Sequence, residues 1–513
     1  MHLYTSCLKS LLFLFVLSFS CQFLSAQIFS LASSGAPFPN LNSGAVSFVD
    51  VDNDGDQDVL ITGQDYDADR GRPGAVVGLY INTEGRFEKK TESTFVPVIF
   101  SHASFADVDK DGDQDVLIMG MSSSGPLTNL YINTGGGNFQ VSAYSASIKD
   151  LHSGSVNFAD IDADGDQDFL ITGFGRTGDG TIGRTIELHL NMGQGNFRLQ
   201  NDHPFTAILN GSAVFADIDR DGDQDVTIIG DKGGSSRPFM AKLFRNSGSG
   251  SYEAALSGAP FAEVTASSTV FVDVDGDEDL DLLVTGAKSD RSALTRLYIN
   301  NGGGGFEPSL GSGIESVTNG SISTADVDND GDQDVFISGY DGTVAFSSLY
   351  INAGGGTFLE AQNEPFLRVN DSASAFADID RDGDQDLLVF GLDDDEVRRT
   401  RMYINNGRAP LVQTDGAMMN CTGGRNGAKA TLLSRQGTTI KLRMDWDEWA
   451  TFSGTALNID NGNCVNCPRI GGIGGPPHGR QKIYTIEQIT PGQPTIISWA
   501  YTNFCGMESI TVE

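Results

Sequence analysis

Aspartate recurs at every second position of the segment DVDNDGDQD, residues 50–58. Two carboxylates about 4 Å apart repel each other by roughly 1 kcal/mol in water and by several times more near a protein surface. No lysine or arginine within the segment offsets this charge. A hard divalent cation removes the repulsion, and calcium takes about six to eight oxygen ligands. The spacing therefore predicts a calcium-binding loop.

The same pattern occurs seven times along the chain, at intervals of 52 to 57 residues, and all five aspartates are present in each copy. Such a repeat is typical of modular folds in which each copy forms one unit. The candidate metal-binding residues are Asp50, Asp52, Asp54, Asp56 and Asp58; Asp107, Asp109, Asp111, Asp113 and Asp115; Asp160, Asp162, Asp164, Asp166 and Asp168; Asp217, Asp219, Asp221, Asp223 and Asp225; Asp273, Asp275, Asp277, Asp279 and Asp281; Asp326, Asp328, Asp330, Asp332 and Asp334; and Asp378, Asp380, Asp382, Asp384 and Asp386.

These loops account for the net charge of the protein. The chain has 68 acidic and 33 basic residues and a net charge of −35, and the seven loops contain 35 carboxylates. Without them, acids and bases would balance at 33 each. The charge is therefore local, and its sign argues against nucleic acid or an anionic membrane surface as a partner.

Within the first loop, position decides the expected role. Asp50, Asp52, Asp54 and Asp58 are predicted to bind calcium through their side chains, and Asp56 through its backbone carbonyl. A glycine at position 6 of the loop permits the sharp turn that calcium loops require. Magnesium fits less well because it demands near-octahedral geometry and retains its waters. Since all seven copies carry the motif, we expect up to seven calcium ions with a structural role.

The loop is not predicted to be an EF-hand. An EF-hand has a bidentate glutamate at position 12, followed by a helix. Here position 12 is aliphatic in every copy: Ile61, Ile118, Ile171, Ile228, Val284, Ile337 and Val389. A short apolar run with a glycine two residues later is typical of a buried strand that ends in a turn. Each loop is therefore expected to join two strands.

The remainder of each repeat also predicts strands. An apolar strand such as SVNFAD precedes each loop, VLITG or a relative follows it, and LYIN with glycines and an aromatic residue comes next. Four strands in about 54 residues are typical of a propeller blade. The seventh copy has no fourth strand of its own, but residues 29–50 align without gaps on residues 252–273. The N-terminal segment is thus predicted to close the ring as the outer strand of the last blade.

The repeated Asp-x-Asp-x-Asp-Gly-x-x-Asp loops between strands resemble the FG-GAP/VCBS repeat family, over residues 27 to about 407. That family includes the propeller head of integrin α-subunits and many secreted bacterial proteins, and some lectins and polysaccharide lyases are calcium-loop propellers of this kind. The resemblance implies a seven-bladed β-propeller with calcium in the loops joining the first and second strands. LITG stands where integrin repeats have Gly-Ala-Pro, which favours the bacterial branch, and Glu278 replaces the loop glycine in the fifth copy.

Two further segments flank the repeats. Residues 1–26 resemble a cleavable export signal, with Lys9 before an apolar run that is too short to span a bilayer; lipid attachment at Cys21 is the alternative. Residues 408–513 predict a small β-sandwich-like domain, which is a possible means of surface attachment. Its cysteines are expected to form disulfides in an exported protein, with a zinc site as the alternative: Cys421, Cys464, Cys467 and Cys505.

The sequence supports two function classes. The first is a secreted or cell-surface binding or adhesion protein for a glycan or an extracellular protein, with its ligand on the loops opposite the calcium sites. Aromatic residues on those loops are Tyr66, Phe174, Phe239 and Tyr340. The alternative is a polysaccharide lyase or glycosidase that uses the same face. A lyase would require the arginines of those loops to converge. For glycoside hydrolysis, DWDEW at residues 445–449 offers paired carboxylates.

Overall fold

The computed structural model describes residues 28–32, 37–67, 72–176, 180–234, 239–255, 261–309, 312–362 and 364–407, together with the backbone of seven strands between 428 and 512. The chain divides into two compact units, one formed mainly by residues 27–409 and the other mainly by residues from 410 onward. Among the described residues the regular structure is all β apart from one short 3₁₀ turn, η1 (Ala143–Ser147). The prediction of an all-β protein is confirmed.

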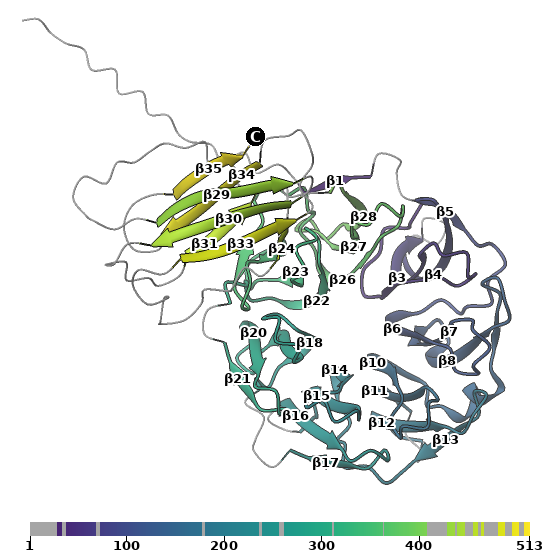
Figure 1. Ribbon diagram of the computed structural model, residues 1–513. Coiled ribbons are helices and arrows are strands. Elements are labelled where there is room, and N and C mark those ends of the chain that lie inside the picture. Colours follow the sequence, from purple (N-terminus) through teal and green to yellow (C-terminus); the bar gives the residue numbers. More distant parts are fainter. Residues whose placement is uncertain are drawn as a thin grey trace, which may run out of the picture. The chain divides into compact units, whose positions relative to one another are not determined.

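The first unit consists of seven four-stranded antiparallel sheets, the blades of a propeller (Figure 1). Blade 1 contains β2 (Val46–Val49), β3 (Asp58–Asp67), β4 (Arg72–Thr83) and β5 (Arg86–Lys89). Blade 2 contains β6 (Ile99–Ala106), β7 (Asp115–Ser122), β8 (Gly125–Asn133) and β9 (Phe139–Val141). Blade 3 contains β10 (Leu151–Ala159), β11 (Asp168–Arg176), β12 (Ile182–Asn191) and β13 (Phe197–Gln200). Blade 4 contains β14 (Leu209–Ala216), β15 (Asp225–Asp231), β16 (Phe239–Asn246) and β17 (Tyr252–Ala254).

The remaining blades follow the same order. Blade 5 contains β18 (Thr265–Val272), β19 (Asp281–Ala287), β20 (Ala293–Asn300) and β21 (Phe306–Pro308). Blade 6 contains β22 (Thr318–Ala325), β23 (Asp334–Tyr340), β24 (Ala345–Asn352) and β25 (Phe358–Glu360). Blade 7 contains β26 (Asn370–Ala377), β27 (Asp386–Leu392), β28 (Arg398–Asn405) and, from the start of the chain, β1 (Phe29–Leu31). The predicted seven-bladed propeller, with its ring closed by the N-terminal strand, is confirmed.

The hydrophobic core lies between neighbouring blades. Seven apolar clusters are present in the described part of the propeller, one between each pair of adjacent sheets around the ring. Each blade contributes the buried residues of its second strand, such as Leu117 and Ile118 of β7, which face the preceding or the following blade in alternation. A strand that is apolar on both faces fits this position, because both of its faces are covered by a neighbouring sheet.

The phenylalanines that end the two copies of SGAPF have equivalent roles. Phe38, which ends the first copy, packs edge-on against Tyr80 with ring centroids 4.8 Å apart. Phe261, which ends the second, packs edge-on against Tyr298 at 5.1 Å. Each phenylalanine thus fills the gap beside the third strand of its blade, which explains why the N-terminal segment resembles a connection between two blades.

The second unit contains two antiparallel sheets. One has the order β29 (Ala428–Gln436), β30 (Thr439–Trp446), β33 (Gln481–Glu487) and β32 (Asn463–Val465). The other has the order β31 (Thr455–Ile459), β34 (Thr495–Tyr501) and β35 (Met507–Val512). Two antiparallel sheets of this size are what a sandwich requires.

Candidate metal centres

Each aspartate loop joins the first and second strands of its blade, and its first carboxylate organises the turn. In blade 1, Asp50 accepts hydrogen bonds from the backbone N–H of Asp54 at 3.2 Å and of Gly55 at 2.9 Å. Gly55 has φ +89°, a left-handed conformation that glycine adopts without a steric penalty. The N–H at position 6 donates to the carboxylate at position 1 in all seven loops. The repeated sequence therefore produces one repeated turn.

The aspartate at position 9 is buried at the start of the second strand. The carboxylate of Asp58 accepts the N–H of Val51 at 3.0 Å and the N–H of Asn82 at 2.8 Å, so it ties the loop to the third strand. Burial raises the pKa of Asp58 to about 6 despite these two hydrogen bonds. Burial likewise raises the pKa to about 7 for Asp115, Asp168, Asp225, Asp281 and Asp386, and to about 8 for Asp334. These carboxylates are unfavourable as bare anions, and a neighbouring cation would offset that cost.

The aspartate at position 3 has a carboxylate oxygen that is buried without a hydrogen-bond partner in most of the described loops. One carboxylate oxygen, Oδ1, is buried and has no hydrogen-bond partner among the described residues in six loops: Asp52, Asp109, Asp162, Asp219, Asp275 and Asp328. Buried polar atoms are normally paired. In blades 1, 2, 3 and 5 the carboxylates at positions 1, 3 and 9 each place an oxygen within 4.8 Å of the others. Hard carboxylate oxygens gathered in this way fit a calcium ion.

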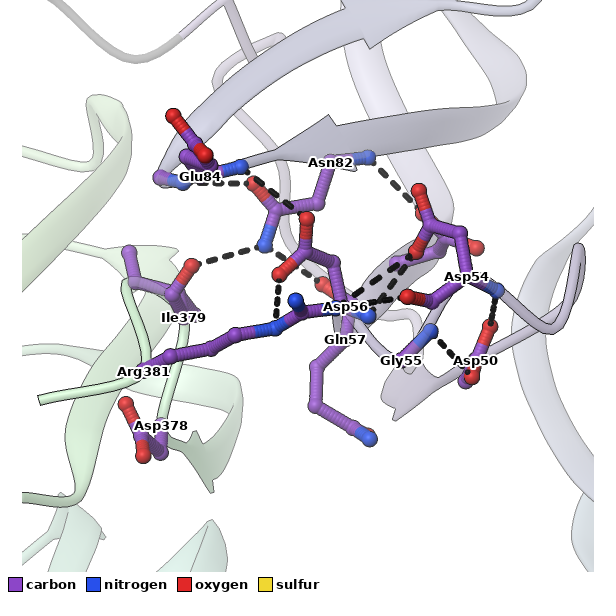
Figure 2. A network of polar contacts seen from close by, with 12 residues as sticks. Asp50, Asp54, Gly55, Asp56, Gln57, Asn82, Glu84, Asp378, Ile379 and Arg381 are labelled. Atoms are coloured by element: carbon purple, nitrogen blue, oxygen red, sulfur yellow. Dashed lines mark hydrogen bonds and ion pairs between the residues drawn. The ribbon is translucent and has the colours of Figure 1, made fainter. Parts of the chain in front are cut away.

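An asparagine at the end of every third strand connects each loop to the preceding blade, a role that was not predicted from the sequence. The side-chain N–H group of Asn82 donates to the carbonyl of Gln57 in its own loop at 3.1 Å and to that of Ile379 in the loop of blade 7 at 2.8 Å (Figure 2). The bond to the preceding loop recurs in all seven blades, from Asn82, Asn133, Asn191, Asn246, Asn300, Asn352 and Asn405. In sequence, this asparagine is visible as the recurring last residue of the LYIN motif.

A second set of contacts joins neighbouring loops through positions 4 and 7. Arg381, at position 4 of the seventh loop, lies with Nε 2.5 Å from Oδ1 of Asp56, at position 7 of the first loop (Figure 2). Equivalent contacts are Asn53–Asp113 at 2.6 Å, Lys110–Asp166 at 2.6 Å, Arg220–Asp279 at 3.0 Å and Asn329–Asp384 at 2.5 Å. Ala163 and Gly276 stand at position 4 of the other two loops. In these five loops the side chain at position 7 therefore contacts the preceding blade, which leaves its backbone carbonyl free for the expected role as a ligand.

The fifth loop forms its turn without the usual glycine. Glu278 occupies position 6 with φ +71°, and its N–H donates to Asp273 at 2.9 Å. This is the bond that glycine makes in the other loops. The Glu278 side chain is largely exposed. The substitution therefore preserves the turn but places a residue with a side chain in a left-handed conformation, which costs about 1–2 kcal/mol.

The connections between second and third strands lie on the face opposite the loops, because the strands of each blade alternate in direction. Of the four aromatic candidates, Tyr66 and Tyr340 have exposed fractions of 57% and 37%. Phe174 is half-buried against the ring of His152, with centroids 5.8 Å apart. Phe239 is the first residue of β16 and its side chain is buried, so the prediction that it is exposed on this face is wrong.

Two arginines near this face make polar contacts across different blade junctions. Arg184 forms an ion pair with Asp231 of the next blade at 3.1 Å. Arg398 donates to the side-chain oxygens of Asn42 at 2.7 Å and Gln64 at 2.5 Å, across the junction of blades 7 and 1. Each of these two arginines thus joins a different pair of adjacent blades.

One buried polar chain occurs in blade 3. His189 receives or donates a hydrogen bond at Nδ1 with the hydroxyl of Tyr144 at 2.8 Å, and its Nε2 lies 3.2 Å from Glu187. The imidazole is fully buried and stacks on Phe169 at 4.4 Å. His189 occupies the position that tyrosine has in the LYIN motif. His189 and Glu187 are both buried, so this group contributes to the packing of the blade.

Several predicted features lie outside the described residues. These are the export signal, Cys421, Cys467 and Cys505, and residues 447–449 of DWDEW; of Cys464 and Asp445 only the backbone is described. The described part of the chain contains no helix long and apolar enough to cross a membrane.

Three solved structures resemble parts of this chain at low similarity. An arginine-to-alanine mutant of AofleA from Arthrobotrys oligospora has 14% identity and a TM-score of 0.39, covering 64% of this chain and 89% of its own. A mutant of the Aleuria aurantia lectin AAL in complex with Fucα1-6GlcNAc has 8% identity and a TM-score of 0.37, covering 64% and 98%. AofleA from Arthrobotrys oligospora has 10% identity and a TM-score of 0.35, covering 72% and 89%. No protein with a curated description matches the chain.

The aspartate loops and the strands around them also match a known repeat. The model of the FG-GAP-like repeat matches residues 50–118, 107–171, 217–284, 273–337 and 326–389. Each matched range begins at the first aspartate of one loop and ends at the aliphatic position 12 of the next. The matches together span more than half of the chain, which therefore belongs to the FG-GAP-like repeat family.

Proposed function

We propose that this protein is an exported, calcium-stabilised propeller that binds a glycan or an extracellular protein on the face opposite its calcium loops. The observation that carries the calcium assignment is the buried, unpartnered carboxylate oxygen at position 3 in six loops. Buried polar atoms in native proteins normally have a partner, so an unpaired carboxylate oxygen indicates that a bound ion is its partner. The carboxylates at positions 1, 3, 5 and 9 would hold the ion, with the carbonyl at position 7.

Calcium in these loops has a structural role. The loops of adjacent blades are joined by the strand-three asparagines and by the contacts from position 4 to position 7. An ion that fixes one loop therefore also fixes its contacts to both neighbours. The ion supplies positive charge that neutralises the loop, and the residues of the chain hold the turn. This arrangement makes the ring rigid and leaves the opposite face available for binding.

The apolar residues exposed on the opposite face support a binding role. Tyr66, Ile182, Tyr340, Val344 and Val397 are among the exposed large hydrophobic side chains, and all lie on or beside connections between second and third strands. Aromatic side chains with one polar end suit contacts with sugar rings and with protein surfaces. The proposal of export is based on the signal-like residues 1–26. The proposal of surface attachment is based on residues 408–513.

The proposal is tested with the calcium-loaded protein on arrays of polysaccharides and oligosaccharides, each spot being assayed for retained protein and for cleaved product. Retention without cleavage is the expected result. Tyr66→Ala and Tyr340→Ala should reduce retention, whereas Leu359→Ala, on the exposed outer strand of blade 6, should leave it unchanged. Cleaved product would instead establish the alternative, a polysaccharide lyase or glycosidase. Capture of an extracellular protein with no glycan retained would identify the protein class of ligand.

A further inference from the structure

The fourth loop differs from the other six in the residue that precedes the strand-three asparagine. In six blades this residue is aliphatic: Ile81, Ile132, Leu190, Ile299, Ile351 and Ile404. In blade 4 it is Arg245. In blade 5 the aliphatic Ile299 packs against Gly356 in the glycine-rich hairpin of the next blade, and in blade 4 Arg245 reaches the corresponding hairpin at Gly304. Arg245 therefore lies next to both the fourth aspartate loop and the following blade.

Arg245 makes an ion pair with a carboxylate of its own loop. Its Nη1 lies 2.5 Å from Oδ2 of Asp219, and its Nη2 donates to the carbonyl of Gly303 in blade 5 at 2.5 Å. The Asp219 side chain is 15% exposed and that of Arg245 is 39% exposed, so solvent screens this pair only in part. Asp219 occupies position 3 of the loop, and its other oxygen, Oδ1, is buried without a hydrogen-bond partner. The guanidinium of Arg245 therefore contacts the position 3 carboxylate, which is a proposed calcium ligand in every loop.

The carboxylate at position 9 is also arranged differently in this loop. In the six other loops its Oδ2 accepts the N–H of the residue at position 2. In the fourth loop, Asp225 is 2% exposed and its Oδ2 has no partner among the described residues. The carboxylates that approach one another here are those of Asp217, Asp219 and Asp221, at positions 1, 3 and 5. Blades 1, 2, 3 and 5 instead bring together the carboxylates at positions 1, 3 and 9.

From these observations we propose that Arg245 makes the fourth loop the weakest calcium site of the ring. This inference rests on the proposed calcium sites and adds a residue that sets their relative affinities. A guanidinium paired with a ligating carboxylate neutralises part of the negative charge that the carboxylate offers to the ion. It also repels the ion directly, because both are positively charged. Changes in groups that contact metal ligands typically alter affinity by about 10- to 100-fold. The protein should therefore hold six calcium ions tightly and bind a seventh only at a calcium concentration at least about tenfold higher.

The test is calcium binding by the full chain in equilibrium dialysis, with a chelator of known affinity as competitor. The wild-type protein should show six tight sites and one weak site. Arg245→Ile, which installs the residue found in five other blades, should show seven tight sites. Arg245→Lys retains the positive charge, so it should keep the seventh site weak. Arg220→Ala removes the other arginine near this loop, which contacts Asp279 of blade 5, and should leave six tight sites.

The outcomes separate this inference from the proposed function. If the wild-type protein bound no calcium, the proposed function itself would fail. Seven equal tight sites in the wild-type protein would overturn only the role of Arg245, as would six tight sites in both the wild-type protein and Arg245→Ile. The double variant Arg245→Ile/Asp219→Asn should return to six tight sites, which assigns the gained site to the fourth loop. The thermal unfolding midpoint in excess calcium verifies that each variant is folded.

Discussion

Phe29 and Asn405 lie directly opposite each other in the antiparallel pairing of β1 with β28, although they come from the two ends of the propeller sequence. The N–H groups of Ile28 and Phe29 also donate to the carboxylate of Glu364, at 2.8 and 3.0 Å. The Phe29 ring is fully buried against Phe366 and Phe376. One short strand therefore closes a ring whose other sheets are each built from consecutive segments.

Replacing Phe29 with alanine should weaken the pairing of β1 with β28 that closes the ring. Removal of a fully buried phenylalanine costs about 3–5 kcal/mol, since the lost burial is accompanied by a cavity. The free energy of unfolding should fall by that amount, as measured by urea denaturation. Leu31→Ala is the matched control, because Leu31 lies on the same strand but is exposed, and it should change stability by less than about 0.5 kcal/mol. Equal effects of the two substitutions would contradict the importance of this closure.

The strand-three asparagines should be essential for stability without contacting the ion. Asn133 is fully buried and donates to Val51 of blade 1 at 2.8 Å, while its Oδ1 accepts the N–H of Gly135 at 3.1 Å. Asn133→Ala leaves these buried groups unpaired, so it should lower the free energy of unfolding by about 2–4 kcal/mol. Asn138→Ala removes an exposed amide in the adjacent hairpin and should have a much smaller effect. Denaturation of both variants in excess calcium makes the comparison.

The sequence predicted the blades because each repeat carries its own information: alternating turns, apolar strands and a charged loop of fixed length. It also predicted ring closure, since Phe29 and Tyr252 begin segments that align. It did not predict the role of Asn133, because the partner of that amide is a backbone carbonyl of another repeat, and a carbonyl has no signature in sequence. The burial of Phe239 was missed for a similar reason, since its environment depends on how adjacent sheets pack.

Positions 3 and 7 of a loop should differ in their effect on calcium. Asp109 has a buried, unpartnered oxygen, whereas the Asp113 side chain accepts a hydrogen bond from Asn53 of the preceding blade at 2.6 Å. Asp109→Asn should therefore remove one tightly bound calcium ion per chain, and Asp113→Asn should retain all of them. Equilibrium dialysis of the two variants decides this point. Loss of an ion from both variants would show that the position 7 side chain is itself a ligand.

The fifth loop can be stabilised by restoring its glycine. Glu278 has φ +71° and an exposed side chain, so Glu278→Gly removes backbone strain with little loss of contact. The gain is offset partly by the greater freedom of glycine in the unfolded chain, which leaves about 0.5–1 kcal/mol. The thermal unfolding midpoint should rise slightly. Gly222→Ala, at the same position of the fourth loop with φ +94°, is the reverse substitution and should lower the midpoint.

The calcium-free protein should have an unusual dependence on pH. Burial raises the folded-state pKa of the carboxylate at position 9 in every loop, to between about 6 and about 8. The folded state therefore binds more protons than the unfolded state from about pH 4 to pH 8, so its stability falls as pH rises through that window. Three histidines act in the opposite sense, because burial lowers the pKa of His102 to about 4 and also lowers the pKa of His152 and of His203, but they are fewer than the seven carboxylates.

The measurement is the thermal unfolding midpoint of protein depleted of metal by prior dialysis against chelator, at pH 5.0 and at pH 7.5. The depleted protein should unfold at a lower temperature at pH 7.5, where the seven buried carboxylates lose their protons without a cation to replace them. Calcium-saturated protein should show the reverse order, since protons compete with the ion for the same oxygens at pH 5.0. Depleted protein that is more stable at pH 7.5 than at pH 5.0 would mean that the buried carboxylates are stable as anions, and that the loops do not depend on a cation to neutralise them.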